Sequence, residues 1–194
     1  FYTYVVSGAV AFSGLFVYLA GSPVIFLRGF GVSQAVYGSI FALIAAGFIG
    51  MGQVNVLLLR KYDNQTLLSA GYAGQILVAG LFVLGVATGS FGLVATVASF
   101  FAFMSFFGLT NPNGTALALA PFGHRAGRAS ALMGFLQMGL GAAISSLVGI
   151  FEIDTTLPVV MIMAAGSVTG AMILVYGRSR IARSEAAIFS RSDA

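Results

Sequence analysis

The sequence predicts an all-α integral membrane protein with six transmembrane helices. The run Asn64–Gly123 spans 60 residues without one Asp, Glu, Lys or Arg. The chain of 194 residues is 59% hydrophobic and 7% charged, with a mean hydropathy of +1.01, whereas soluble domains are about 25% charged. A soluble domain needs polar cover on its outer faces, but a helix in lipid does not. Because a spanning helix needs roughly 20 residues, the chain has room for about six.

The breaks between uncharged runs place the first three helices. We expect them at residues 3–27, 34–59 and 66–87. Near the end of the first, Pro23 leaves a backbone carbonyl without its helical partner, so a kink is expected there. The second ends at the polar run Arg60-Lys61-Tyr62-Asp63-Asn64-Gln65, and Asn64 or Thr66 is a suitable N-cap for the third.

Similar breaks place the last three helices. We expect them at residues 92–119, 129–151 and 158–177. The turn Thr88-Gly89-Ser90 precedes the fourth, and Pro112 inside it predicts a second kink. Glu152-Ile153-Asp154 ends the fifth, and Pro158 lies at the start of the sixth, where a helix tolerates proline.

Charge in the loops predicts the orientation. One set of loops holds Arg60, Lys61, Arg125 and Arg128 and is joined by the arginines after residue 177, whereas the other set holds one arginine and two acids. The positive-inside rule places the first set and both chain ends in the cytoplasm. We therefore expect residues 1–177 to form a six-span bundle and 178–194 to form a cytoplasmic tail.

Small residues repeat at four-residue spacing in two of the helices. Gly166 and Gly170 do so in the sixth, and Ala42, Ala46 and Gly50 do so in the second. Such rows allow helices to approach closely in membranes. We expect both rows to be packing seams of a tight bundle.

Several functional classes are excluded by composition. The chain has no cysteine and one histidine, His124, which lies in a loop beside arginines. A cysteine nucleophile, a disulfide framework and a zinc site are therefore excluded, and we expect no catalytic residue, metal or cofactor and no enzyme. No charged residue lies in the middle of a span, so this chain has no obvious proton relay. The net charge of +4 comes from helix ends and does not predict nucleic-acid binding.

Uncharged polar residues within the spans are the candidate substrate contacts. For each, an interhelical hydrogen bond and a cavity-lining role both remain open. Asn111 and Asn113 lie two residues apart on one helix, so their side chains point to different sides of it. We expect Asn111 to face a cavity and Asn113 to form a hydrogen bond with a neighbouring helix. The residues assigned to a substrate cavity are Tyr18, Ser22, Asn111, Met133 and Gln137.

One stretch resembles a known family. The run Asn111–Ala142, NPNGTALALAPFGHRAGRASALMGFLQMGLGA, resembles the tenth and eleventh spans of the Bcr/CflA group of multidrug efflux transporters, within the major facilitator superfamily. Gly21-Ser22-Pro23 with Phe30-Gly31-Val32-Ser33 resembles the seventh span and its outer loop, and Gly52–Lys61 resembles the eighth span and the basic loop after it. Asp63-Asn64-Gln65 departs from the related motif, which is richer in glycine and arginine.

The resemblance implies the C-terminal half, spans seven to twelve, of a twelve-span transporter built from two inverted three-helix repeats. A start at Phe1 rather than Met fits a piece of a longer polypeptide. The implied activity is export of small hydrophobic drug-like molecules in exchange for protons, in the bacterial inner membrane. The implied partners are membrane lipid and the N-terminal six-span half, which would carry the coupling carboxylate. Arg60, Lys61, Arg125 and Arg128 would help to close a cytoplasmic gate, although the positive-inside rule alone also accounts for them.

Two other functions stay open. A major-facilitator importer of a small metabolite has the same fold, but a metabolite site usually needs fixed charged groups, which these spans lack. A stand-alone six-span structural membrane protein would have no partner half and no transport activity.

Overall fold

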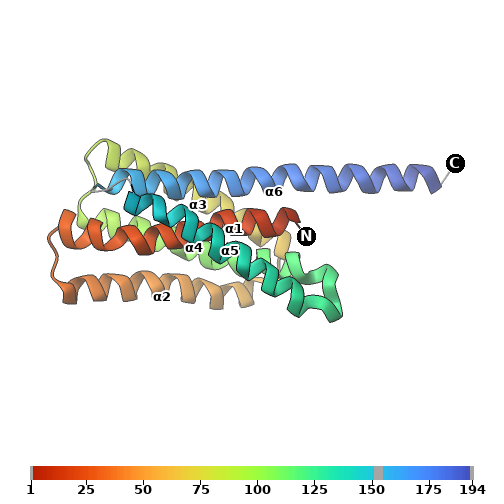
Figure 1. Cartoon of the computed structure of the whole chain (residues 1–194), viewed down its shortest axis with the longest axis horizontal. Coiled ribbons are helices and arrows are strands. Elements are labelled where there is room, and N and C mark those ends of the chain that lie inside the picture. Colours follow the sequence, from red (N-terminus) through yellow and green to blue (C-terminus); the bar gives the residue numbers. More distant parts are fainter. Residues whose placement is uncertain (1, 151–154, 193–194) are drawn as a thin grey trace.

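The computed structural model describes residues 2–150 and 155–192, with side chains described as far as residue 180 except at 147 and 150. Within these ranges the chain is helical and contains no strand (Figure 1). The elements are α1 (Tyr2–Pro23), the π-helix η1 (Val24–Gly29), α2 (Gln34–Leu58), α3 (Asn64–Ala87), α4 (Leu93–Leu119), the 3₁₀-helix η2 (Ala120–Arg125), α5 (Ala126–Ile150) and α6 (Thr156–Ser192).

Five stretches of the described chain are long and apolar enough to cross a membrane. They are Tyr2–Gly29, Gln34–Leu58, Asn64–Ala87, Leu93–Ser146 and Thr156–Arg180. The fourth stretch has 54 residues and contains α4 and most of α5. Between them the backbone reverses at Gly123, whose φ of 40° is a left-handed conformation that favours glycine. The protein is thus a multi-pass membrane protein.

The helix ends agree with the sequence expectations to within a few residues, with two differences. Asp63, rather than Asn64 or Thr66, caps α3, because its carboxylate accepts a hydrogen bond from the Thr66 backbone N–H at 3.3 Å. The helix expected to end at residue 177 continues to Ser192, so α6 projects beyond the bundle at the end where both termini lie (Figure 1). The expected end of the fifth helix, at Glu152-Ile153-Asp154, lies outside the described residues.

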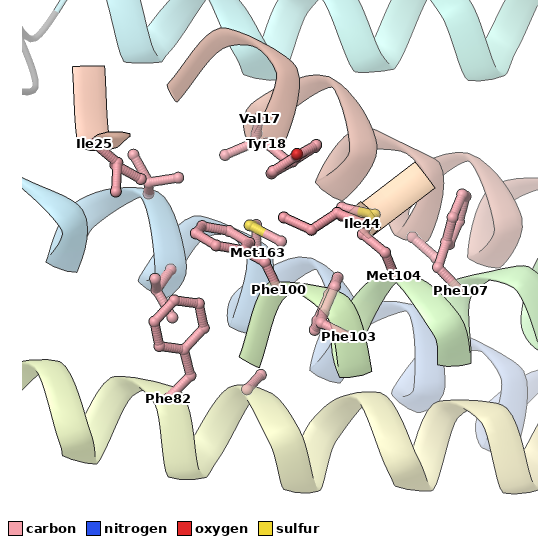
Figure 2. Packing of buried hydrophobic residues seen from close by; sticks show 14 of the residues in the cluster. Val17, Tyr18, Ile25, Ile44, Phe82, Phe100, Phe103, Met104, Phe107 and Met163 are labelled. Atoms are coloured by element: carbon pink, nitrogen blue, oxygen red, sulfur yellow. The ribbon is translucent and has the colours of Figure 1, made fainter. Parts of the chain in front are cut away.

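Two central helices organise the packing. Helix α1 packs against α5 and α6, whereas α4 packs against α2 and α3; α1 also contacts α4, and α3 contacts α6. Aromatic rings fill the space between them (Figure 2). Phe100 of α4 is fully buried and lies edge-on to Phe82 of α3, with ring centroids 4.8 Å apart.

Glycines permit the closest helix contacts, and one of the two predicted rows is among them. A Cβ on Gly166 would lie 3.3 Å from the Val10 carbonyl oxygen, and one on Gly170 would lie 3.1 Å from that of Ser7, so α6 approaches α1 closely. The prediction of a seam in this bundle along Ala42, Ala46 and Gly50 is wrong, because all three positions are exposed.

Helix α2 instead packs through the neighbouring face. There a Cβ on Gly108 of α4 would meet the Phe48 carbonyl oxygen of α2, so the two backbones touch. The sequence pattern correctly indicated a row of small residues on α2, but that row lies on the exposed face of α2 and not on the face that packs against α4.

The two prolines behave differently. Pro23 is the last residue of α1, and the wider η1 follows it directly. Pro112 lies inside α4, which continues as a helix to Leu119 rather than stopping at the proline. The backbone on either side of Pro112 therefore keeps Asn111 and Asn113 on one continuous helix.

Candidate functional site

A small cavity lies where α1, α4 and α5 meet, with α3 behind it. None of the described residues that line it is Asp, Glu, Lys, Arg or His. Three of the five predicted substrate contacts, Asn111, Met133 and Gln137, lie on its wall. The other lining residues are Tyr4, Ser7, Gly8, Ala11, Leu68, Tyr72, Phe107, Thr110, Gly114 and Thr115.

Two amides on this wall are available to a ligand. Asn111 is half-buried and Gln137 is 8% exposed. Neither makes a hydrogen bond to any residue that the structure describes. A Cβ on Gly8 would lie 3.7 Å from Nε2 of Gln137, which is ordinary van der Waals contact, so the Gln137 amide lies close to α1 at this position. Each amide offers two N–H donors and a carbonyl acceptor, which suits recognition of an uncharged polar group.

The back wall is fixed by a buried hydroxyl network. The Ser7 hydroxyl donates to the Gly170 carbonyl at 2.7 Å, and the Tyr72 hydroxyl donates to the Ser7 carbonyl at 3.0 Å. The two hydroxyl oxygens lie 2.7 Å apart. This network joins α1, α3 and α6 behind the cavity, and so holds the wall rigid. The sequence analysis missed both residues, because a single serine or tyrosine in a span forms no pattern.

Asn113 makes the interhelical bond that the sequence predicted. Its Nδ2 donates to Oδ1 of Asn55 on α2 at 2.7 Å and to the Leu109 carbonyl at 2.7 Å. The side chain is fully buried. The sequence analysis did not select Asn55, although an amide within an apolar span is the feature by which it could have been found.

Tyr18 and Ser22 lie away from this cavity. The Tyr18 ring packs against Phe41 and Phe100, and its buried hydroxyl has no hydrogen-bond partner among the residues that the structure describes. Ser22 shares a hydrogen bond of 2.9 Å with the Tyr37 hydroxyl. The structure therefore does not bring these two residues together with Asn111, and a role for them in substrate contact stays a prediction.

The predicted gate residues occupy two separate places at the end of the bundle that holds the termini. Arg60 and Lys61 are exposed in the turn after α2. Arg125 and Arg128 line an open groove between the start of α1 and the start of α5. His124 is exposed on η2, outside the residues that line the cavity. A gating role for the four basic residues stays a prediction.

Comparison with known proteins finds two transporter-related sequences. The chain is 33% identical over 164 residues, 82% of its length, to the uncharacterized MFS-type transporter YdgK of Bacillus subtilis. The chain is a relative of MFS-type transporters. It is also 24% identical over 177 residues, 91% of its length, to a bicyclomycin resistance protein homolog of Haemophilus influenzae. The resemblance to the Bcr/CflA group of MFS transporters is thereby confirmed.

Both of these relatives are much longer than the chain itself. It spans 39% of the length of the Bacillus protein and 44% of the length of the Haemophilus protein. No family model matches the chain, and no solved structure matches it.

Proposed function

We propose that this chain is the C-terminal, six-span half of a proton-driven multidrug efflux transporter that works by alternating access. One observation carries the proposal. This chain is similar to a bicyclomycin resistance protein homolog. In it, the side-chain amides of Asn111 and Gln137, which make no hydrogen bond to any described residue, lie on the wall of one cavity without charged described residues, where three helices meet.

Helix lengths support six spans. A helix of 54 residues would be about 80 Å long, whereas the hydrocarbon core of a bilayer is about 30 Å thick. The reversal at Gly123 divides the Leu93–Ser146 stretch into two crossings, one by α4 and one by α5. Six crossings would place both ends of the chain on one side of the membrane, and this agrees with Figure 1, in which both ends lie at the same end of the bundle. By the positive-inside rule that side is the cytoplasm, and the membrane is the bacterial inner membrane.

The packing partners support two inverted three-helix repeats. Exchanging α1, α2 and α3 with α4, α5 and α6 converts the α1–α5 pair into the α4–α2 pair. The same exchange converts the α1–α6 pair into the α4–α3 pair, and it leaves α1–α4 and α3–α6 unchanged. All these pairs pack against each other in the structure, as inverted repeats require.

A second half would complete the site. The cavity is bordered by α1, α4 and α5, while α2 leaves Ala42, Ala46 and Gly50 exposed to a partner. No described residue on this cavity wall is a carboxylate, and we assign the proton-coupling group to the other half of the proposed transporter. A described wall that combines amides and hydroxyls with aromatic and aliphatic groups, and that holds no charge, suits small, uncharged or weakly charged hydrophobic molecules. The proposed energy source is the proton gradient, and no cofactor is required.

Transport in proteoliposomes tests the proposal. The full-length protein is reconstituted with a fluorescent drug, and a proton gradient is imposed across the membrane. Exchange of the drug against protons, abolished by an uncoupler, is the expected result. Movement of the drug in the same direction as the protons would instead indicate an importer. No movement of any tested drug or metabolite in either direction would favour a structural membrane protein.

A further inference from the structure

A crease between α1 and α5 has one charged end and one apolar end. At the charged end, Arg125, Arg128, Ala129 and Leu132 face Tyr2 and Phe122 across a groove. At the apolar end, Val6 and Ala9 of α1 face Phe135, Leu136, Gly139, Leu140 and Ala143 of α5. The apolar groove lies between α1 and α5. The charged groove lies between Tyr2 of α1, Phe122 and Arg125 of η2 and the first residues of α5, so it adjoins the apolar groove on the N-terminal side of both helices. They therefore form one crease, which we call the α1–α5 crease.

The two arginines of the α1–α5 crease lack an acidic partner. Neither makes an ion pair with any residue that the structure describes. Asp63 is the one acid whose side chain is described, and it caps α3. Two guanidinium groups at the mouth of a groove suit an anion with several oxygen acceptors, above all a phosphate.

The crease faces away from the candidate substrate cavity. Val6 lines the crease and Gly8 lines the cavity. On α5, Phe135 lines the crease and Gln137 lines the cavity. Positions two apart on a helix point about 160° away from each other. A second half that closes over the cavity would therefore leave the crease toward the surrounding lipid, and Phe135 is 73% exposed on it.

The apolar part has the length of one bilayer leaflet. From Leu132 to Ala143 the axis of α5 rises about 16 Å, roughly half of the 30 Å hydrocarbon core. Gly139 and Ala143 keep this track open, and a Cβ on Gly139 would meet no atom within 4 Å. An acyl chain fits along such a track while its headgroup stays at the charged end.

We propose that the α1–α5 crease is a binding site for an anionic phospholipid. Arg125 and Arg128 bind the headgroup phosphate, and one acyl chain lies along Val6, Leu136 and Gly139. The proposal is independent of the transported substrate. It gives the two arginines a role that the positive-inside rule alone does not require.

Lipid titration of the full-length protein tests the site. The protein is purified in detergent, and binding of phosphatidylglycerol and phosphatidylcholine is measured by native mass spectrometry. The double variant Arg125→Gln, Arg128→Gln should bind phosphatidylglycerol about 30-fold more weakly, the loss expected for two basic residues near an anionic headgroup. Its weaker binding of phosphatidylcholine should be unchanged. The matched control, Arg60→Gln with Lys61→Gln, removes two charges at the same end of the bundle and should bind as the unaltered protein does.

A second variant tests the acyl track. Gly139→Leu fills the crease without meeting another atom of the protein, so it should weaken phosphatidylglycerol binding while both arginines remain. Unchanged binding in either test variant, or an equal loss in the Arg60 and Lys61 control, would overturn the proposal. Disulfide crosslinking of Gly139→Cys to a segment outside this chain would also overturn it, because the crease would then be an intramolecular interface.

Discussion

Asn113 of α4 donates a hydrogen bond from Nδ2 to Oδ1 of Asn55 on α2 across 2.7 Å, and both side chains are buried. The same Nδ2 also donates to the Leu109 carbonyl, whereas Oδ1 of Asn113 has no partner in the described part of the chain. The pair links the two helices near the end of the bundle that carries the basic turn after α2. One amide of the Asn111-Pro112-Asn113 motif is thus structural, while the other lines the cavity.

The Asn55–Asn113 pair should be energetically coupled. Interhelical hydrogen bonds in membranes contribute about 0.6 kcal/mol on average and up to about 1.7. We expect Asn55→Ala and Asn113→Ala each to lower the free energy of unfolding by about 1 kcal/mol, and the double variant to lose less than the sum. A double-mutant cycle on the full-length protein, unfolded in mixed micelles, measures this. A coupling energy of zero would mean that the contact contributes nothing to stability.

Gly108 should not tolerate a larger side chain. A Cβ there would meet the backbone of Phe48, which cannot move without displacing α2. We expect Gly108→Ala to destabilise the protein by about 1–3 kcal/mol, the usual range for overpacking. Gly80→Ala on α3 is the matched control, because no described atom lies within 4 Å of its Cβ position. Melting temperatures in detergent compare the two, and equal melting temperatures would contradict the close α2–α4 contact.

The cap of α3 should weaken at acidic pH. The hydrogen bond with Thr66 holds the pKa of the Asp63 carboxyl below its ordinary value of 3.8. Because the folded pKa is lowered, the stabilisation is present above the ordinary value and is lost as the pH falls through the folded pKa. Amide exchange at Thr66 should therefore be faster in Asp63→Ala than in the unaltered protein at neutral pH, and the difference should shrink in acid.

Asp63→Asn is the control for this prediction. Asparagine caps a helix as well as aspartate does but carries no charge. It should protect the Thr66 amide at neutral pH and should lose no protection in acid. A loss of protection in acid that is equal in both proteins would assign the pH effect to another group.

Much of the fold was predictable because lipid imposes a simple rule. Long runs without charge must be helices, and polar breaks must end them, so span positions followed from composition alone. The side of each helix that packs against its neighbours was harder to predict. Ala42, Ala46 and Gly50 formed the clearest small-residue row on α2, yet Gly47, one position from Ala46, packs against Phe101 and Ser105. A shift of one residue turns a helix by about 100°, and an apolar sequence gives little evidence of which face meets which neighbour.

The candidate site shows the same limit. Asn111, Met133 and Gln137 were assigned to a cavity as isolated polar or adaptable residues, and they do meet. Tyr18 has the same chemical character but lies among aromatic rings elsewhere. Tyr72 and Ser7 complete the back wall only because α3 and α6 pass behind α1, an arrangement that no local motif encodes.

Cysteine accessibility tests the proposed site most directly. This chain has no native cysteine, so single cysteines at positions 111, 113 and 137 can be introduced into the full-length protein after any cysteine outside this chain is removed. Asn111→Cys and Gln137→Cys should react with a water-soluble maleimide, and a transported drug should slow both reactions. Asn113→Cys should stay unreactive, because Asn113 is fully buried against α2. Labelling at position 113 but not at 111, or labelling that no transported drug slows, would contradict a substrate site at this cavity.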